Sequence, residues 1–150
     1  MKSAAILPPL LTRKKVELIQ EEGDCTVTGS YLLLYRAVYN LVENAIKYNH
    51  SGGKVTVKIS QTKALPAAHS KPTDYALVEV TDTGIGISPE FQEKIFDPFF
   101  RVDKSRSRAM GGAGLGLALV NEIARQHGGQ VKVLASSEQG STIALVLPLS

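Results

Sequence analysis

The sequence is short of cysteine. Its 150 residues contain only Cys25, so it can form no internal disulfide and has no CxxC pair for a metal cluster. A reducing compartment such as the cytoplasm fits this composition. The sequence also lacks any apolar run near the roughly 20 residues that span a bilayer. The apolar part of its start, MKSAAILPPLLTRKK, is too short for a signal peptide. We therefore predict a cytoplasmic domain without direct membrane contact, compatible with a membrane-anchored parent protein.

A strong charge of one sign is missing as well. The net charge of +3 is too small to indicate nucleic-acid binding, although it would favour a polyphosphate ligand. No internal repeat is visible. The hydrophobic fraction of 43% and the charged fraction of 21% are typical of a soluble globular chain. The length predicts one domain with a single core.

The stretch Tyr31–Asn49 predicts a long helix. At about 100° per residue, Asn40, Asn44 and Lys47 share one narrow face, and a wide apolar stripe covers the remaining arc. Ser30 is the expected N-cap. Side-chain amides are costly to bury without partners. They either cap nearby backbone groups or bind a ligand, and the helix alone does not decide between these.

The other elements follow from period-two alternation and from turn residues. Strands are predicted over Lys14–Gln20, Cys25–Thr28, Lys54–Ser60, Tyr75–Asp82, Gln130–Ser136 and Ser141–Pro148. Further helices are predicted from Ser88 to Phe96 and over Leu115–His127, with a surface excursion at 61–74 and a mobile basic loop at 101–112. The expected fold is a two-layer α/β (α+β) sandwich. It has a mixed, mostly antiparallel sheet of about five strands, with three helices on one face.

Two glycine-rich segments carry potential chemistry. In Asp82-Thr83-Gly84-Ile85-Gly86, the carboxylate continues the helix-covered face of its strand, and the glycines would let the backbone approach a flat ligand. An acid there can accept a hydrogen bond from an exocyclic amine, although a plain Asp-Gly turn explains the same letters. In GGAGLGL, residues 111–117, a glycine loop runs into a helix and offers amide groups to phosphates. Alone, each motif is weak.

In combination they resemble the catalytic domain of sensor histidine kinases, within the gyrase–Hsp90–histidine kinase–MutL group that has the Bergerat-type ATP-binding fold. NLVENAIKY is similar to the N box of that family, DTGIGI to the G1 box, FDPFFR to the F box and GGAGLGL to the G2 box. The resemblance runs from about Lys14 to Pro148. It implies an ATP-binding catalytic domain over 14–150, after a lead-in segment at 1–13, that uses ATP and Mg²⁺.

The resemblance also implies roles for individual residues. Asn44 would bind Mg²⁺, Asn40 would support metal and phosphates, and Lys47 and Arg101 would contact phosphates. Tyr48 would border the nucleotide, and Asp82 would bind the adenine amino group. The remaining implied contacts with the nucleotide are Gly84, Gly86, Gly112, Ala113, Gly114, Leu115, Gly116, Leu117 and Thr142.

Two departures from the wider family bear on activity. Asn40 stands where hydrolysing members have a glutamate that activates water, which favours transfer to a protein side chain. Ala113 replaces a common threonine.

None of the histidines, His50, His69 and His127, lies in the sequence context of the family's phosphoacceptor. The family dimerises through a helical hairpin, and no such hairpin is predicted before residue 14, so the resemblance implies a monomeric domain. Its partner would be a histidine-bearing dimerisation domain, which this chain lacks, and a response regulator would be reached indirectly. A regulatory nucleotide-binding module and an anti-sigma-type serine kinase are the alternatives.

Overall fold

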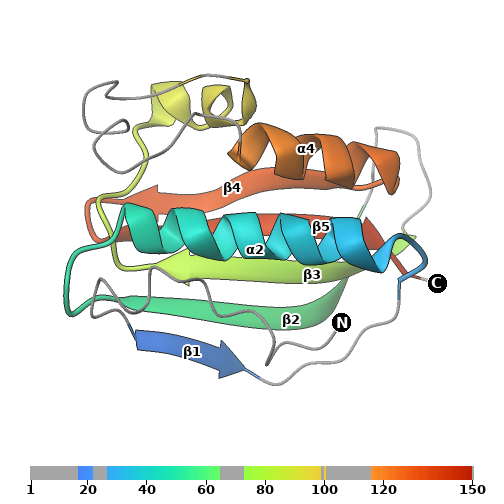
Figure 1. Ribbon diagram of the computed structural model, residues 1–150, viewed down its shortest axis with the longest axis horizontal. Helices are drawn as coiled ribbons and strands as arrows, with labels where there is room; N and C mark the ends of the chain where they lie inside the picture. Colours follow the sequence, from blue (N-terminus) through green and yellow to red (C-terminus); the bar gives the residue numbers. More distant parts are fainter. Residues whose placement is uncertain (1–16, 22–26, 65–72, 99, 101–115, 150) are drawn as a thin grey trace.

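The computed structural model describes residues 17–21, 27–64, 73–98, 100 and 116–149. They form two layers, with helices covering one face of a sheet (Figure 1). The elements in chain order are β1 (Glu17–Glu21), α2 (Tyr31–Lys47), β2 (Lys54–Ala64), β3 (Thr73–Asp82), the 3-10 helices η2 (Pro89–Phe91) and η3 (Lys94–Phe96), α4 (Gly116–Gln126), β4 (Gln130–Ser137) and β5 (Gly140–Pro148).

The strands lie in the order β1-β2-β3-β5-β4. β1 pairs with β2 in parallel, whereas the other three pairings are antiparallel. The predicted mixed, mostly antiparallel five-stranded sheet is therefore confirmed. In its register, Asp82 lies at the end of β3 between Val55 of β2 and Ser141 of β5.

Three local predictions differ from the structure. The helix expected from Ser88 to Phe96 is instead η2 and η3, because a short segment flanked by Pro89 and Pro98 cannot offset the cost of starting an α-helix. A strand was expected at 25–28, but Val27 and Thr28 belong to no strand, and the other two residues lie outside the described part. β2 and β3 also extend into the predicted excursion, to Ala64 and from Thr73.

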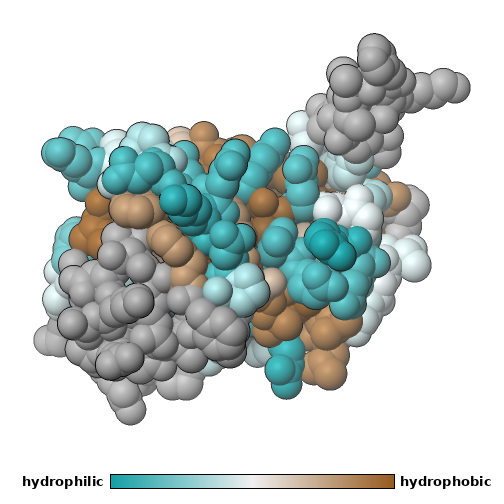
Figure 2. Space-filling model, turned by 90° about the horizontal axis from the view of Figure 1, so that it is seen from above, coloured by the Kyte–Doolittle hydropathy of each residue, from teal (hydrophilic) through white to brown (hydrophobic). Residues whose placement is uncertain are grey.

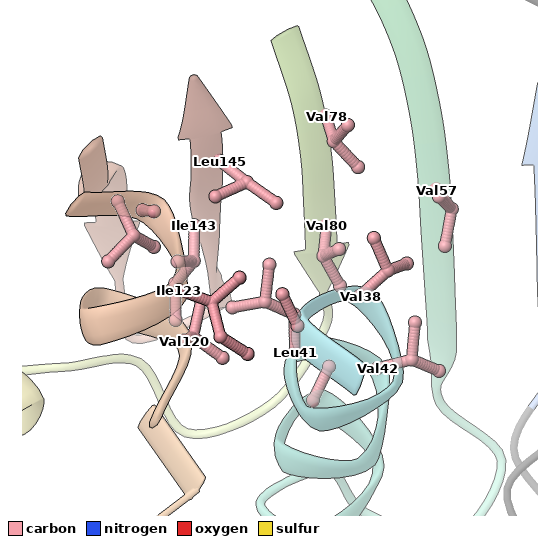
Figure 3. Packing of buried hydrophobic residues seen from close by; sticks show 14 of the residues in the cluster. Val38, Leu41, Val42, Val57, Val78, Val80, Val120, Ile123, Ile143 and Leu145 are labelled. Atoms are coloured by element: carbon pink, nitrogen blue, oxygen red, sulfur yellow. The ribbon is translucent and has the colours of Figure 1, made fainter. Parts of the chain in front are cut away.

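The core lies between the two helices and the sheet. Alternate residues of β3 and β5, such as Val80 and Ile143, point toward α2 and α4 (Figure 3). Leu41 of α2 and Ile123 of α4 meet them there, each almost fully buried. Burying a side chain of this size contributes roughly 1.5–3 kcal/mol, so this interface holds the helices to the sheet. Tyr75, Ala144 and Val146 form a separate small cluster on the opposite face.

The surface is mixed in character. Seen from above, hydrophilic side chains cover much of the coloured surface, with smaller apolar areas between them (Figure 2). In the part of the chain that the structure describes, no helix has both the length and the apolar character needed to cross a membrane.

The start of α2 is tied to the end of α4. Ser30 caps α2, with its hydroxyl accepting from the backbone N–H of Leu33 at 3.3 Å. The backbone N–H of Ser30 in turn donates to Nε2 of His127 at 3.1 Å, and Nδ1 of His127 lies 2.8 Å from the carbonyl oxygen of Ile123. These two contacts assign the ring proton to Nδ1. His127 is therefore a structural bridge between the helices.

We expect His127→Ala to lower the free energy of unfolding by about 1–2 kcal/mol, because Ser30 N–H and Ile123 C=O both lose a partner. Urea unfolding measures this. The matched control is Gln126→Ala at the neighbouring exposed position, whose expected effect is within about 0.5 kcal/mol. Equal effects of the two variants would contradict the bridging role.

Candidate functional site

Asp82 is a nearly buried acid at the end of β3, with 8% of its surface exposed. It lies on the helix-covered side because it continues the alternation of Val78 and Val80. Its Oδ1 accepts from the Gly84 backbone N–H at 2.9 Å, and its Oδ2 accepts from the Ser141 hydroxyl at 3.0 Å. Burial raises the pKa of Asp82, and the hydrogen bonds from Gly84 and Ser141 oppose that shift. The site therefore holds an acceptor in a poorly hydrated place.

The loop after Asp82 packs against backbone on both sides. A Cβ on Gly84 would collide with the Tyr48 carbonyl oxygen at the end of α2, which also accepts from Ile85 N–H at 3.4 Å. Gly86 has φ +77°, and a Cβ there would collide with the Ser137 carbonyl oxygen of β4. That these glycines also admit a ligand stays a prediction. In the structure, they admit the protein's own backbone, which anchors the loop between α2 and the β4–β5 hairpin.

Asn40, Asn44 and Lys47 form a polar strip on α2, which begins at that loop and runs back along the helix. Lys47, in the last turn, lies 3.6 Å from Glu43 across one helical turn. Asn44 is half-buried, and none of the hydrogen bonds found between described residues uses its side chain. Asn40 donates from Nδ2 to the Arg36 carbonyl oxygen at 2.9 Å, and its Oδ1 lies next to Gly116 at the start of α4. The strip therefore presents amide oxygens and a cation in a row.

The first turn of α4 lies beside Asn40. A Cβ on Gly116 would be 3.4 Å from Oδ1 of Asn40. Gly116 and Leu117 are the first described residues of α4, and the positive end of a helix favours an anion. From Tyr48 to Asn40 is about 12 Å along the helix axis, a length that an extended nucleoside triphosphate can bridge. Of the predicted site residues, these lie outside the described part: Arg101, Gly112, Ala113, Gly114 and Leu115.

Thr142 is not brought to this site. Its hydroxyl lies 2.9 Å from that of Thr81, its partner on β3, on the sheet face that carries Ala144. The hydroxyl that reaches Asp82 belongs to Ser141, one residue earlier. In the structure, the hydroxyl beside Asp82 is therefore that of Ser141, and Thr142 lies on the other face of the sheet.

If Asp82 binds a nucleotide base, Ser141→Ala is expected to weaken binding about tenfold, because the carboxylate loses a charge-assisted hydrogen bond that orients it. Thr142→Val, the neighbouring change on the opposite face, should leave affinity within about twofold. Titration calorimetry with ATP measures both. Loss of binding in Thr142→Val alone would restore the original assignment.

Two residues of this region were missed from the sequence. Asn49 and Thr83 bond to each other and to the start of β2. Asn49 precedes a His-Ser-Gly-Gly turn, and Thr83 stands at the first unspecified position of the DxGxG pattern. From the sequence, both therefore look like ordinary turn residues. Their contact joins residues 34 positions apart, which local pattern does not reveal.

The donor set available to a metal is small. Among described residues, no group of three or more His, Cys, Asp or Glu side chains could hold a metal ion. The oxygens at the strip are amide oxygens of Asn40 and Asn44. Such a set suits a hard ion that keeps several waters and shares the oxygens of a ligand, as Mg²⁺ does.

This fold and this arrangement define a known class of nucleotide-binding ATPase. The family described as histidine kinase-, DNA gyrase B-, and HSP90-like ATPase matches residues 29–150, and the chain belongs to it.

The particular relatives are sensor histidine kinases. The chain is 44% identical over 122 residues to sensor-like histidine kinase SenX3 of Mycobacterium tuberculosis, covering 81% of this chain and 27% of the relative. It is 39% identical to sensor histidine kinase RppB of Synechocystis, covering 85% and 26%. It is 37% identical to histidine protein kinase SaeS of Staphylococcus aureus, covering 76% and 30%. The chain therefore spans less than a third of the length of these relatives.

Solved structures agree. The mycobacterial sensor histidine kinase MprB matches with a TM-score of 0.71 and 31% identity, over 93% of this chain and 87% of that one. Full-length ShkA in complex with AMPPNP matches with a TM-score of 0.73 and 26% identity, over 95% of this chain and 27% of that one.

Proposed function

We propose that residues 14–150 are the ATP-binding catalytic domain of a two-component sensor histidine kinase. The domain would transfer the γ-phosphoryl group of Mg-ATP to a histidine on a separate dimerisation domain. The observation that carries the proposal is the buried acid Asp82, hydrogen-bonded by Ser141 and Gly84, next to the loop from which the polar strip of α2 begins. The complex of the similar ShkA with AMPPNP, an ATP analogue, supports the choice of ligand.

Asp82 would recognise the adenine. Its ionised carboxylate accepts hydrogen bonds only, so it suits the exocyclic amino group of adenine and disfavours the carbonyl of guanine. Ser141 and the Gly84 N–H hold the carboxylate in place. Gly86 holds the loop against β4, and Tyr48 borders it from the end of α2.

The phosphates and Mg²⁺ would follow α2. Asn44 would supply an oxygen to the metal, supported by Asn40, whose Nδ2 donates to the Arg36 carbonyl oxygen and whose Oδ1 lies next to Gly116. Lys47 would contact the phosphates after exchanging its ion pair with Glu43. Mg²⁺ would neutralise charge on the phosphate oxygens. Arg101 and the glycine loop from Gly112 through Ala113, Gly114 and Leu115 to Gly116 and Leu117 would complete the phosphate side.

The polar strip of α2 is suited to phosphoryl transfer and not to ATP hydrolysis. Phosphoryl transfer depends on positioning and charge neutralisation. Asn40 cannot act as a general base for water, because a carboxamide does not take up a proton near neutral pH. The amide instead suits a site that positions the triphosphate for another nucleophile.

The phosphoacceptor would be a histidine outside this chain. His127 is engaged between Ser30 and Ile123, and His50 lies beside the Asn49 turn, where its Nδ1 is 3.2 Å from the Ser51 carbonyl oxygen. The partner would therefore be the dimerisation domain of the parent protein, with a response regulator as the next acceptor. The domain would act in the cytoplasm as a monomer, without nucleic acid or direct membrane contact, and residues 1–13 would lead into it.

The test is to mix the domain with Mg-ATP and the dimerisation domain of its parent. Phosphate that is labile to acid and stable to base is expected on the acceptor histidine. Acid-stable phosphoserine would indicate a serine kinase of the anti-sigma type. ATP binding without transfer to any acceptor would indicate a regulatory nucleotide-binding module.

A further inference from the structure

One side chain beside Asp82 joins three elements of the site. The Thr83 hydroxyl accepts from the Lys54 backbone N–H at 2.8 Å and donates to Oδ1 of Asn49 at 3.2 Å, with the Lys54 carbonyl oxygen 3.4 Å away as the alternative acceptor. Lys54 is the first residue of β2, and Asn49 lies just beyond the end of α2. Thr83 therefore ties the loop after Asp82 to both of these elements.

The hydrogen bonds of Asn49 restrict this connection to one arrangement. It is 5% exposed, its Nδ2 donates to the Lys54 carbonyl oxygen at 2.9 Å, and its Oδ1 also accepts from the His50 N–H at 2.9 Å. A buried amide whose partners are all in place specifies one arrangement of its surroundings. The end of α2 thus cannot shift relative to the loop without breaking these bonds.

The sheet alone ties the loop to β2 but not to α2. The β2–β3 register ends at the pair Val55 and Asp82, and one further backbone hydrogen bond, from Thr83 N–H to the Lys54 carbonyl oxygen at 3.1 Å, extends it by one step. On the other side, α2 reaches the loop through the Tyr48 carbonyl and Ile85 N–H, whose separation of 3.4 Å is long for a hydrogen bond. Of these two contacts between the loop and the end of α2, the one from the Thr83 hydroxyl to Asn49 Oδ1, at 3.2 Å, is the shorter.

We propose that Thr83, through Asn49, is a positioning residue that sets the spacing between the adenine-binding acid Asp82 and the phosphate-binding strip of α2. This proposal rests on the proposed function. A ligand with two linked ends gains affinity from both only when the two halves of its site are held at the matching distance. Loosening the junction should therefore weaken the binding of ATP, which spans both halves, more than that of adenosine, which has no phosphates to reach the strip of α2.

The experiment compares wild type, Thr83→Val and Thr83→Ser in the full 150-residue chain. Valine keeps the branched shape and removes the hydroxyl, whereas serine keeps the hydroxyl. Affinities for Mg-ATP and for adenosine are measured by titration. Thr83→Val is expected to weaken ATP about tenfold and adenosine no more than about twofold, and Thr83→Ser is expected to restore ATP binding.

Thr81→Val is the matched control, because the same change on β3 removes a hydroxyl from the opposite sheet face; it should leave both affinities unchanged. Asn49→Ala removes the partner of Thr83 and should give the same selective loss if Thr83→Val does not fold. Equal losses for ATP and adenosine, or no loss in either variant, would overturn the positioning role. A wild-type chain that does not bind ATP would instead refute the proposed function.

Discussion

Asp82→Asn is expected to weaken ATP binding by about a hundredfold. The asparagine oxygen can keep the hydrogen bond from Gly84 N–H, which turns its amide nitrogen toward Ser141 and the ligand. A donor then faces the adenine amino group, itself a donor, and the charge-assisted acceptor is lost. Titration calorimetry with Mg-ATP measures the loss. The control Asp74→Asn makes the same change at the exposed start of β3 and should leave affinity unchanged.

The pH dependence of the free energy of unfolding separates the loss of ATP affinity in Asp82→Asn from a loss of folding. Because burial raises the pKa of Asp82 in the folded state above the ordinary 3.8, its contribution to stability is fully present below the unfolded pKa and is lost as pH rises through the folded pKa. Asp82→Asn should therefore gain stability relative to wild type as pH rises across that window, as measured by urea unfolding. A loss of stability of Asp82→Asn relative to wild type as pH rises, or unchanged ATP affinity, would contradict the assignment of Asp82.

The sequence predicted the features that follow from periodicity. The spacing of apolar residues located α2, and Ser30 was correctly expected as its cap. Strand alternation in β3 placed the Asp82 carboxylate on the helix-covered face, and its burial confirms this. These are local consequences of a 3.6-residue or two-residue period, which is why they could be read from one sequence.

The hydroxyl beside Asp82 could not be assigned in this way. Ser141 and Thr142 are adjacent and both carry hydroxyls, and the run from Ile143 to Leu147 is apolar on both faces. A continuous apolar strand gives no period-two signal to say which neighbour faces the helices. The register between β3 and β5 decides the matter, since it pairs Asp82 with Ser141.

The prediction for the DTGIG motif gave only part of the reason for its two glycines. Its two glycines predicted an approach of backbone to ligand, but the contacts that exclude a Cβ at Gly84 and Gly86 are carbonyl oxygens of Tyr48 and Ser137. These carbonyls come from segments distant in the sequence, so no local pattern names them. The motif therefore builds the support of the acid.

Gly86→Ala tests that support and is the second substitution with a large expected effect. An alanine at φ +77° would carry the left-handed penalty of about 1–2 kcal/mol, and its Cβ would also collide with the Ser137 carbonyl, which is backbone and cannot rotate away. The loop would have to leave β4, breaking the 2.6 Å hydrogen bond from Ile87 N–H to the Ser136 hydroxyl. We expect a total loss of about 3 kcal/mol or more in the free energy of unfolding.

Gly52→Ala is the matched control because Gly52 has φ +88° and nothing within 4 Å of a built Cβ. It should show the conformational penalty alone, about 1–2 kcal/mol, with unchanged ATP affinity. The difference between the two variants in urea unfolding then isolates the collision with Ser137. Gly86→Ala protein that remains folded should also bind ATP at least tenfold more weakly, since Asp82 would lose its anchored loop. Equal destabilisation by the two substitutions would show that the loop can move away from β4 at little cost.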